Sequence, residues 1–283
     1  MKRGLHALPL LLLLVTPLLQ AGHDVELTDH PSPYLQSHAD DAVHWRVKES
    51  AAINQARQEG KLIFLSSGYQ SCYWCYRMKQ DTFSDDNSAA LINDNFLPIL
   101  IDRELEPRLD SQLQQILAEQ RGVGGWPANV ILTPEGYPVA SFSYADPDNL
   151  IPGLSGLLER RDSEPAQLIS EGQAVLARLE QEKEASERLL SDTSLAELLQ
   201  RFLQQANAAA DTTNGGFGDS EKYPHLPQLQ ALLALTAVVP DASITGFIRT
   251  TLDAMLQQGL RDQLGGGFFR YTTDRQWRTP HYE

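Results

Sequence analysis

The chain has 283 residues, of which 42% are hydrophobic and 21% are charged. This is the composition of a globular protein and not of a disordered one, and at roughly 100–200 residues per domain the length predicts about two domains. With 23 Lys and Arg against 37 Asp and Glu, the formal net charge is −14. This balance argues against a nucleic-acid partner, because phosphate binding needs clustered basic side chains.

The N-terminus has the pattern of a secretory signal. Lys2 and Arg3 precede a short apolar run, Leu8–Leu19, and the small residue Ala21 follows it. We expect residues 1–21 to be a signal peptide cut after Ala21, which predicts an exported protein in the periplasm or another extracytoplasmic compartment. A retained membrane anchor is the alternative, but the run is shorter than the roughly 20 apolar residues that span a bilayer. No stable membrane insertion is expected after cleavage.

Runs of strand length and segments of helical spacing alternate over the next part of the chain. We predict helix 49–59, strand 61–66, helix 72–95 with an interruption near 83–86, strand 96–101, helix 108–121, strands 129–133 and 138–143, and helix 148–160. The run 61–66 is continuously apolar, as in a strand covered on both faces. This order predicts an α/β thioredoxin-like domain at residues 31–161, with a central mixed sheet flanked by helices.

The remainder of the chain is predicted to be helical. Residues 162–190 carry the charge run 180–184 and are typical of a charged helical linker. Three amphipathic segments follow in 191–283, separated by Gly-rich loops at 214–218 and 265–267. Helical hairpins joined by such loops predict part of an (α/α) toroid. Three helices expose too much apolar surface to be complete, so we expect the chain to stop inside this second domain.

The chain contains only two cysteines, Cys72 and Cys75, and their spacing makes them a site and not a disulfide framework. Directly after a buried strand, Cys72 would lie at a helix N-terminus, where unpaired N–H groups favour the thiolate. Cys72 would then attack a substrate disulfide, and Cys75 would resolve the mixed disulfide. The alternatives are a zinc site, which lacks a second ligand pair, a purely structural disulfide, and a coincidence of two buried cysteines.

A second signal is Trp126–Pro127, which follows a Gly-rich loop and directly precedes an apolar strand. Proline fits poorly inside a strand and suits a cis peptide bond at its start, although a trans proline in a loop is the alternative. In thioredoxin-like folds a cis-proline at this point packs against the active-site sulfurs. Trp74, Trp126 and Pro127 are therefore the predicted substrate-binding residues.

The chain resembles a family through a combination of motifs. The matching stretches are 32–39 (SPYLQSHA), 63–69 (IFLSSGY), 72–75 (CYWC), 102–104 (DRE), 124–130 (GGWPANV) and 265–268 (GGGF), then Arg270, Tyr271, Trp277, Pro280, His281 and Glu283. The family is that of the spermatogenesis-associated, thioredoxin-domain proteins and their bacterial relatives. The resemblance implies a thioredoxin-like domain fused to an α/α toroid, and it covers nearly the whole mature chain.

The chain departs from the family pattern in two ways. The family usually has His between the cysteines and just after the second, where this sequence has Tyr73 and Tyr76. A His cation would stabilise the Cys72 thiolate, so we expect a weaker oxidant than a His-bearing site would give. Similar proteins also continue for several more helix pairs beyond Glu283, so a truncated gene or a fragment is expected.

Strand 61–66 lacks the buried carboxylate that many thioredoxins use as proton acceptor for the resolving cysteine. Asp102 and Glu104, at the end of the next strand, are candidate substitutes, and loop-capping carboxylates are the alternative for each.

Three functions remain open from the sequence. The first is a protein thiol–disulfide oxidoreductase that uses the Cys72–Cys75 disulfide, with no other cofactor and no metal; its partners would be protein thiol or disulfide clients and a redox partner that the sequence does not name. The second is a carbohydrate-active or glycan-binding toroid with a redox-inert thioredoxin-like domain. The third is a chaperone-like module that holds cysteine-containing clients. Candidate residues for the second are Asp219, Glu221, Tyr223, His225, Asp262 and Tyr271.

Overall fold

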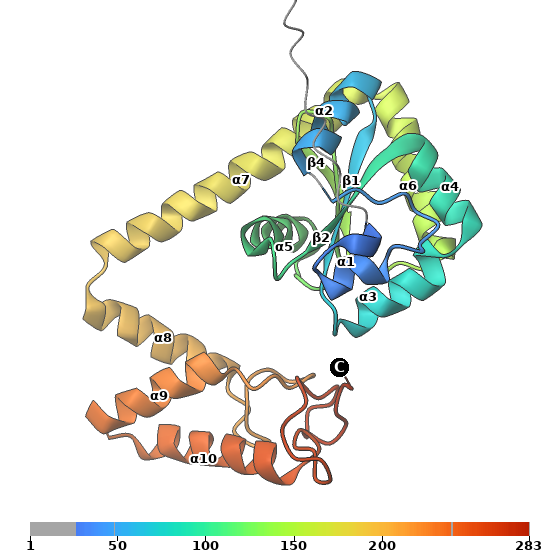
Figure 1. The fold of residues 1–283 in the computed structure, drawn as a ribbon. Helices are drawn as coiled ribbons and strands as arrows, with labels where there is room; N and C mark the ends of the chain where they lie inside the picture. The colour runs from blue at the N-terminus through green and yellow to red at the C-terminus, as the bar shows by residue number, and fades with distance from the viewer. Residues whose placement is uncertain (1–26, 48, 239, 283) are drawn as a thin grey trace, which may run out of the picture.

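A four-stranded mixed sheet forms the centre of the first half of the protein (Figure 1). The computed structural model describes residues 27–47, 49–238 and 240–282, so the predicted signal peptide at 1–21 lies outside the described residues. In spatial order the strands are β2 (Phe96–Asp102), β1 (Leu62–Gly68), β3 (Ala128–Leu132) and β4 (Pro138–Phe142). β1 pairs with β2 in parallel and with β3 antiparallel, and β3 pairs with β4 antiparallel.

Helices cover both faces of this sheet, which explains why β1 and β2 are buried along their whole length. Side chains of β1 alternate between two hydrophobic clusters, with Phe64 in one and Ile63 and Leu65 in the other. The helices of this half are η1 (Leu27–Asp29), α1 (Pro33–Ser37), α2 (Glu49–Glu59), α3 (Tyr73–Met78), η2 (Lys79–Phe83), α4 (Asp86–Asn95), α5 (Pro107–Arg121) and α6 (Pro147–Ser163). The predicted thioredoxin-like order of elements is confirmed.

The predicted interruption of the helix after the cysteines also has a local cause. α3 continues through the single π-helical turn η2, and Ser84 and Asp85 then break the helix. The side chain of Asp85 accepts a hydrogen bond from the Ser88 N–H, 2.8 Å long, and caps α4.

α7 (Pro165–Asp192) leaves the sheet as a long single helix (Figure 1). Its first half packs against β4 and α5 and buries Leu168 and Val175. Its second half, from Glu180 to Leu189, is exposed throughout, as a charged linker would be. The N-terminal turns of α7 therefore belong physically to the thioredoxin-like core, although they fall within the predicted linker 162–190.

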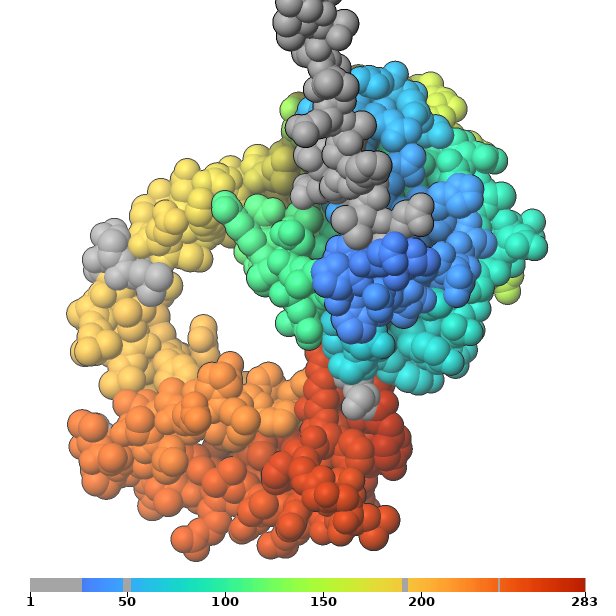
Figure 2. Space-filling view, in the orientation of Figure 1, coloured from blue at the N-terminus to red at the C-terminus, as the bar shows by residue number. Residues whose placement is uncertain are grey.

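The chain then turns back as a helical region, with α8 (Leu195–Ala209), α9 (Leu226–Val238) and α10 (Ala242–Gln257). Its small core is formed by Leu229, Met255, Leu260 and Trp277. Leu195 on α8 is 81% exposed, so much of the apolar surface of these helices is uncovered. The space-filling view shows the C-terminal loops returning to the thioredoxin-like half beside α3 (Figure 2). Among the described helices, none is long and apolar enough to cross a membrane.

Candidate redox site

Cys72 and Cys75 form a disulfide at the end of β1, where the chain enters α3. Cys72 is the N-cap residue of α3, and its Sγ accepts a hydrogen bond from the Cys75 N–H, 3.1 Å long. This N–H would also stabilise a thiolate on Cys72, since a charged sulfur is a better acceptor than a neutral one. The structure thus places the pair where the sequence predicts it.

Gly68, the last residue of β1, allows two side chains to approach the strand end closely. A Cβ atom on Gly68 would lie 2.8 Å from Cys75 Sγ and closer still to Tyr34 Oη. Both atoms therefore lie against the backbone of Gly68, and any larger residue would displace at least one of them. Tyr34, from the short helix α1, was not among the sequence-predicted site residues.

The Trp126–Pro127 peptide bond is cis, as predicted. α5 holds the loop before it, because Gln114 donates to the Gly125 carbonyl and accepts from the Gly125 N–H at 2.9 and 2.8 Å. The Trp126 indole N–H donates to Asp110 Oδ1, 2.9 Å away. Trp126 also packs against the buried cluster that contains both cysteines.

Asp110 is the residue at this site that sequence reasoning missed. It is 5% exposed, and its Oδ1 also accepts a 2.7 Å hydrogen bond from the buried Ser67 hydroxyl of β1. One carboxylate therefore ties the cis-proline loop to the strand that delivers the cysteines. A signal was present: Asp110 shares the apolar stripe of α5 with Leu113 and Leu117, where a carboxylate is out of place.

The face of Trp126 is covered by a cation. The Arg103 guanidinium lies 4.1 Å from the centre of the indole ring, and Tyr69 contacts the ring edge-on at 5.7 Å. Trp74 lies elsewhere on the rim, where it packs against Tyr144 and remains 43% exposed. The predicted substrate platform is thus divided between the exposed face of α3 and the cis-proline loop.

Asp102 and Glu104 have different surroundings. Asp102 is buried and accepts hydrogen bonds from the Ser32 hydroxyl at 2.6 Å and the Glu104 N–H at 2.9 Å. It pairs in register with Gly68, so it lies at the same end of the sheet as the disulfide. Glu104 is exposed. The bond from the Glu104 N–H is that of a loop-capping residue, whereas the bond from Ser32 joins α1 to the end of β2. The role of Asp102 as proton acceptor stays a prediction.

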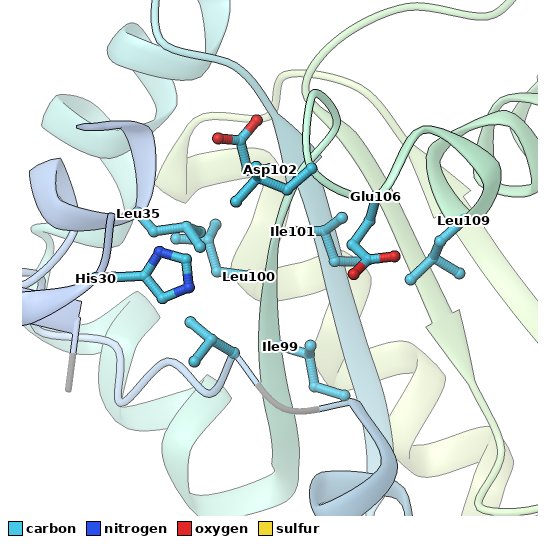
Figure 3. A pocket seen from close by; sticks show the side chains of 10 residues that line it. His30, Leu35, Ile99, Leu100, Ile101, Asp102, Glu106 and Leu109 are labelled. Atoms are coloured by element: carbon cyan, nitrogen blue, oxygen red, sulfur yellow. The ribbon is translucent and has the colours of Figure 1, made fainter. Parts of the chain in front are cut away.

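Asp102 also lines a cavity of about 360 Å³ at the outer edge of β2. In Figure 3 His30 and Leu35 lie on one side of β2, and Glu106 and Leu109 lie on the other. In the part of the chain that the structure describes, no group of three or more His, Cys, Asp or Glu is arranged to hold a metal ion.

The chain is similar to several known proteins. The family model Thioredox_DsbH, described as a protein of unknown function (DUF255), matches residues 24–178, more than half of the chain. The chain belongs to this family. The resemblance to spermatogenesis-associated proteins is confirmed as well: the rat and human spermatogenesis-associated protein 20 are each 34% identical to it over 269 residues.

That alignment covers 91% of this chain and 34% of each relative, so the family member described here spans about a third of their length. An uncharacterized protein of Caenorhabditis elegans is 29% identical over 267 residues. Among solved structures, a DsbH oxidoreductase aligns with 41% of this chain and 81% of its own, at 21% identity and a TM-score of 0.32. A Thermus thermophilus thioredoxin aligns with 42% of this chain and 89% of its own, at 19% identity and a TM-score of 0.35.

The helical region reaches the candidate redox site, which the sequence did not predict. His281 contacts the ring of Tyr73, between the two cysteines, with 5.4 Å between ring centres. Arg270 contacts the Tyr69 hydroxyl and lies 5.6 Å from the centre of the Trp126 ring. Cys72 itself is only 3% exposed.

The residues predicted for a glycan site do not share one environment. Asp219, Glu221 and Tyr223 are exposed, whereas Tyr271 is half-buried and stacks on both Tyr223 and His281 at about 4.5 Å. Asp262 caps its own Gly-rich loop by accepting hydrogen bonds from the Leu264 and Gly265 N–H groups; these hold the pKa of its carboxyl below the ordinary value. His225 contacts Phe217 edge-on and lies at a tilt to the ring of Tyr223.

Proposed function

We propose that the protein is an exported thiol–disulfide oxidoreductase that acts on protein clients, with Cys72 as the attacking sulfur and Cys75 as the resolving sulfur. One observation carries the proposal. The only two cysteines of the sequence form a disulfide at a strand–helix junction, and the cis peptide bond of Pro127 directly precedes β3, which pairs with the strand that leads to them. Export itself rests on the signal-like pattern of residues 1–21, which lie outside the described residues.

The proposed chemistry is thiol–disulfide exchange. In the oxidising direction a client thiolate attacks Cys72 Sγ, a mixed disulfide forms, and Cys75 leaves as a thiolate. In the reducing direction Cys72 attacks a client disulfide and Cys75 then releases the client. The N–H of Cys75 donates to Cys72 Sγ and favours its thiolate. Tyr73 replaces the His that the family resemblance implies, so a moderate oxidant is expected.

Trp126, Pro127 and Trp74 are the proposed client-binding residues. The loop that carries Trp126 is held from two sides, by Gln114 and by Asp110, so an extended client segment would meet a preorganised edge. The exposed aromatic rings Tyr73, Trp74 and Tyr76 on α3 would contact apolar client side chains beside the reacting sulfur.

The test is the reduction potential of the Cys72–Cys75 couple, measured by trapping thiols across glutathione buffers. A value between about −270 and −120 mV supports an exchange catalyst, and its position separates a reductant from an oxidant. A value below about −300 mV indicates an inert structural bridge and refutes the proposal.

The roles of the two sulfurs are tested with matched variants. Cys75→Ser should accumulate a mixed disulfide with a client or with glutathione, because the resolving sulfur is gone. Cys72→Ser should accumulate none. Loss of activity confined to the Cys75 variant would contradict the assignment, and a persistent mixed disulfide in the wild-type protein would favour a chaperone-like holding module.

The glycan-binding alternative has its candidate residues in the helical region. Tyr271 stacks on the rings of Tyr223 and His281, and these contacts occupy ring surface that a sugar would need. A glycan-array screen tests this alternative: specific sugar binding that is unchanged in Cys72→Ser would favour it over the redox function.

A further inference from the structure

The strand that leads to the cysteine pair provides no carboxylate that could accept a proton from Cys75, the proposed resolving cysteine. Cys75 is 2% exposed, and β1 (Leu62–Gly68) contains neither Asp nor Glu. During exchange the sulfur of Cys75 becomes a thiolate, and a buried charge needs a hydrogen-bond donor or a counter-charge. The side chain that the fold places beside this sulfur therefore sets how easily the thiolate forms.

That side chain is Tyr34. Its hydroxyl oxygen and Cys75 Sγ both lie within 3.0 Å of the position that a Cβ on Gly68 would occupy. Because Gly68 has no side chain, it leaves room for the hydroxyl group and the sulfur to lie against the same point of the strand. The sequence gives no sign that these two side chains share this point, since Tyr34 and Cys75 are 41 residues apart.

Several contacts hold Tyr34 in place. It is 4% exposed and lies in α1, whose N-cap Ser32 accepts a 3.1 Å hydrogen bond from the Leu35 N–H. The Ser32 hydroxyl in turn donates to Asp102, which anchors α1 to the end of β2. The Tyr34 ring also packs edge-on against His38 at 4.9 Å. A hydroxyl held this firmly loses little entropy when it makes a hydrogen bond.

Burial and the charges around Tyr34 keep its hydroxyl protonated. Burial, with the carboxylates of Asp41 and Asp102 adding to it, raises the pKa of Tyr34 above its ordinary value. Asp41 is itself paired with His38 at 2.6 Å and lies 3.6 Å from Lys79 Nζ. Tyr34 is thus a proton-bearing donor across the ordinary pH range.

We propose that the Tyr34 hydroxyl group is the hydrogen-bond donor that stabilises the thiolate of Cys75 during exchange. This inference rests on the proposed oxidoreductase function. Tyr34 would be a positioning residue that stabilises Cys75 Sγ, which is the leaving sulfur when a client is oxidised and the attacking sulfur when a client is reduced. A hydrogen bond from a hydroxyl group can do this without a buried carboxylate.

The step balances without any further reagent. A client thiolate attacks Cys72 Sγ, a client–Cys72 bond forms, the Cys72–Cys75 bond breaks, and its electron pair remains on Cys75 Sγ. Tyr34 donates its O–H to this sulfur and keeps its proton. A second client thiolate then attacks the client sulfur and releases Cys72. The client loses two electrons, and the two protons from its thiols end on Cys72 and Cys75.

The test is a titration of Cys75 in the Cys72→Ser background, where it is the only cysteine. The carbon-13 chemical shift of its labelled Cβ reports thiolate formation without any reagent entering the buried site. Adding Tyr34→Phe removes the hydroxyl and keeps the ring, and we expect it to raise the pKa of Cys75 by about 1–2 units, as for the loss of a hydrogen bond to a charged group. Tyr137→Phe, on the turn before β4, is the matched control and should leave the titration unchanged.

An unchanged or lowered pKa of Cys75 in the Tyr34→Phe variant would overturn the proposal. Should that variant not fold, Gly68→Ala in the same background gives an independent test, because its methyl group separates the hydroxyl from the sulfur and should raise the pKa as well. No client takes part in the titration. An inert reduction potential would therefore refute the redox function and leave the effect of Tyr34 on the titration of Cys75 standing, whereas an unchanged titration would refute the proposed hydrogen bond alone.

Discussion

Replacing Asp110 with alanine should loosen the loop that carries Trp126 and weaken the fold. Asp110 Oδ1 accepts two hydrogen bonds, from the Ser67 hydroxyl at 2.7 Å and from the Trp126 indole at 2.9 Å. Hydrogen bonds to a charged group contribute about 1.5–3 kcal/mol each, and the fully buried Ser67 hydroxyl would be left unpaired. We expect the free energy of unfolding to fall by about 3–5 kcal/mol.

A double-mutant cycle isolates the bond to the indole. Asp110→Ala, Trp126→Phe and the double variant are compared by urea unfolding followed by far-ultraviolet circular dichroism, and a coupling energy of about 1.5–3 kcal/mol is expected. Ser67→Ala with Trp126→Phe is the control cycle and should show weaker coupling, because it leaves Asp110 in place. A coupling below about 0.5 kcal/mol between Asp110 and Trp126 would refute the reasoning.

The same variants test the role of the loop in function. If Trp126 positions the client, Asp110→Ala should raise the KM for a protein client while the reduction potential of the cysteine couple stays close to the wild-type value. A matching change in the potential would mean that Asp110 acts on the sulfurs and not on the client platform.

Three other predictions concern the two halves of the protein. Gly68→Ala should destabilise the fold by about 1–3 kcal/mol in thermal melts, because its methyl group would overlap with Cys75 Sγ; a neutral effect would mean that the contact relaxes freely. Tyr73→His should raise the reduction potential in glutathione buffers, since an imidazolium favours the thiolate, and an unchanged potential would show that this position does not influence the couple. Asp211→Asn should cost about 3–5 kcal/mol in urea unfolding, because it leaves the fully buried Lys222 ammonium without its counter-charge.

The lowered pKa of Asp211 also predicts that the stability of the fold depends on pH. The pKa of Asp211 lies below its ordinary value, chiefly because Arg275 donates a hydrogen bond to the carboxylate. Burial opposes this shift, and hydrogen bonds from Asn214 and Lys222 add to it. A lowered pKa in the folded state contributes stability above the unfolded value of about 3.9, and this contribution is lost as the pH falls. The wild-type protein should therefore lose stability below about pH 5 more steeply than Asp211→Asn, and parallel pH profiles would contradict the assignment.

Several features could be read from the sequence because local rules decide them. The apolar run at 61–66 is of strand length, the break at Ser84–Asp85 uses a capping carboxylate, and the cysteine pair follows a strand directly. The cis bond at Pro127 was predictable from the residue type and from its place before a strand. These signals act over a few residues, so neighbours in the sequence are enough to reveal them.

Other features depend on the tertiary structure alone. Tyr34 and Cys75 approach the same point of Gly68 although 41 residues separate them, Ser67 and Asp110 are 43 residues apart, and His281 reaches Tyr73 from the far end of the sequence. α7 likewise contains a charge run typical of a solvated linker, yet its first half is held by β4 and α5. Such contacts form because sheet pairing and helix packing bring remote segments together, and no periodicity or local motif encodes the partner. The sequence by itself therefore determined the elements and the place of the cysteine pair, whereas packing decided which side chains surround the two sulfurs.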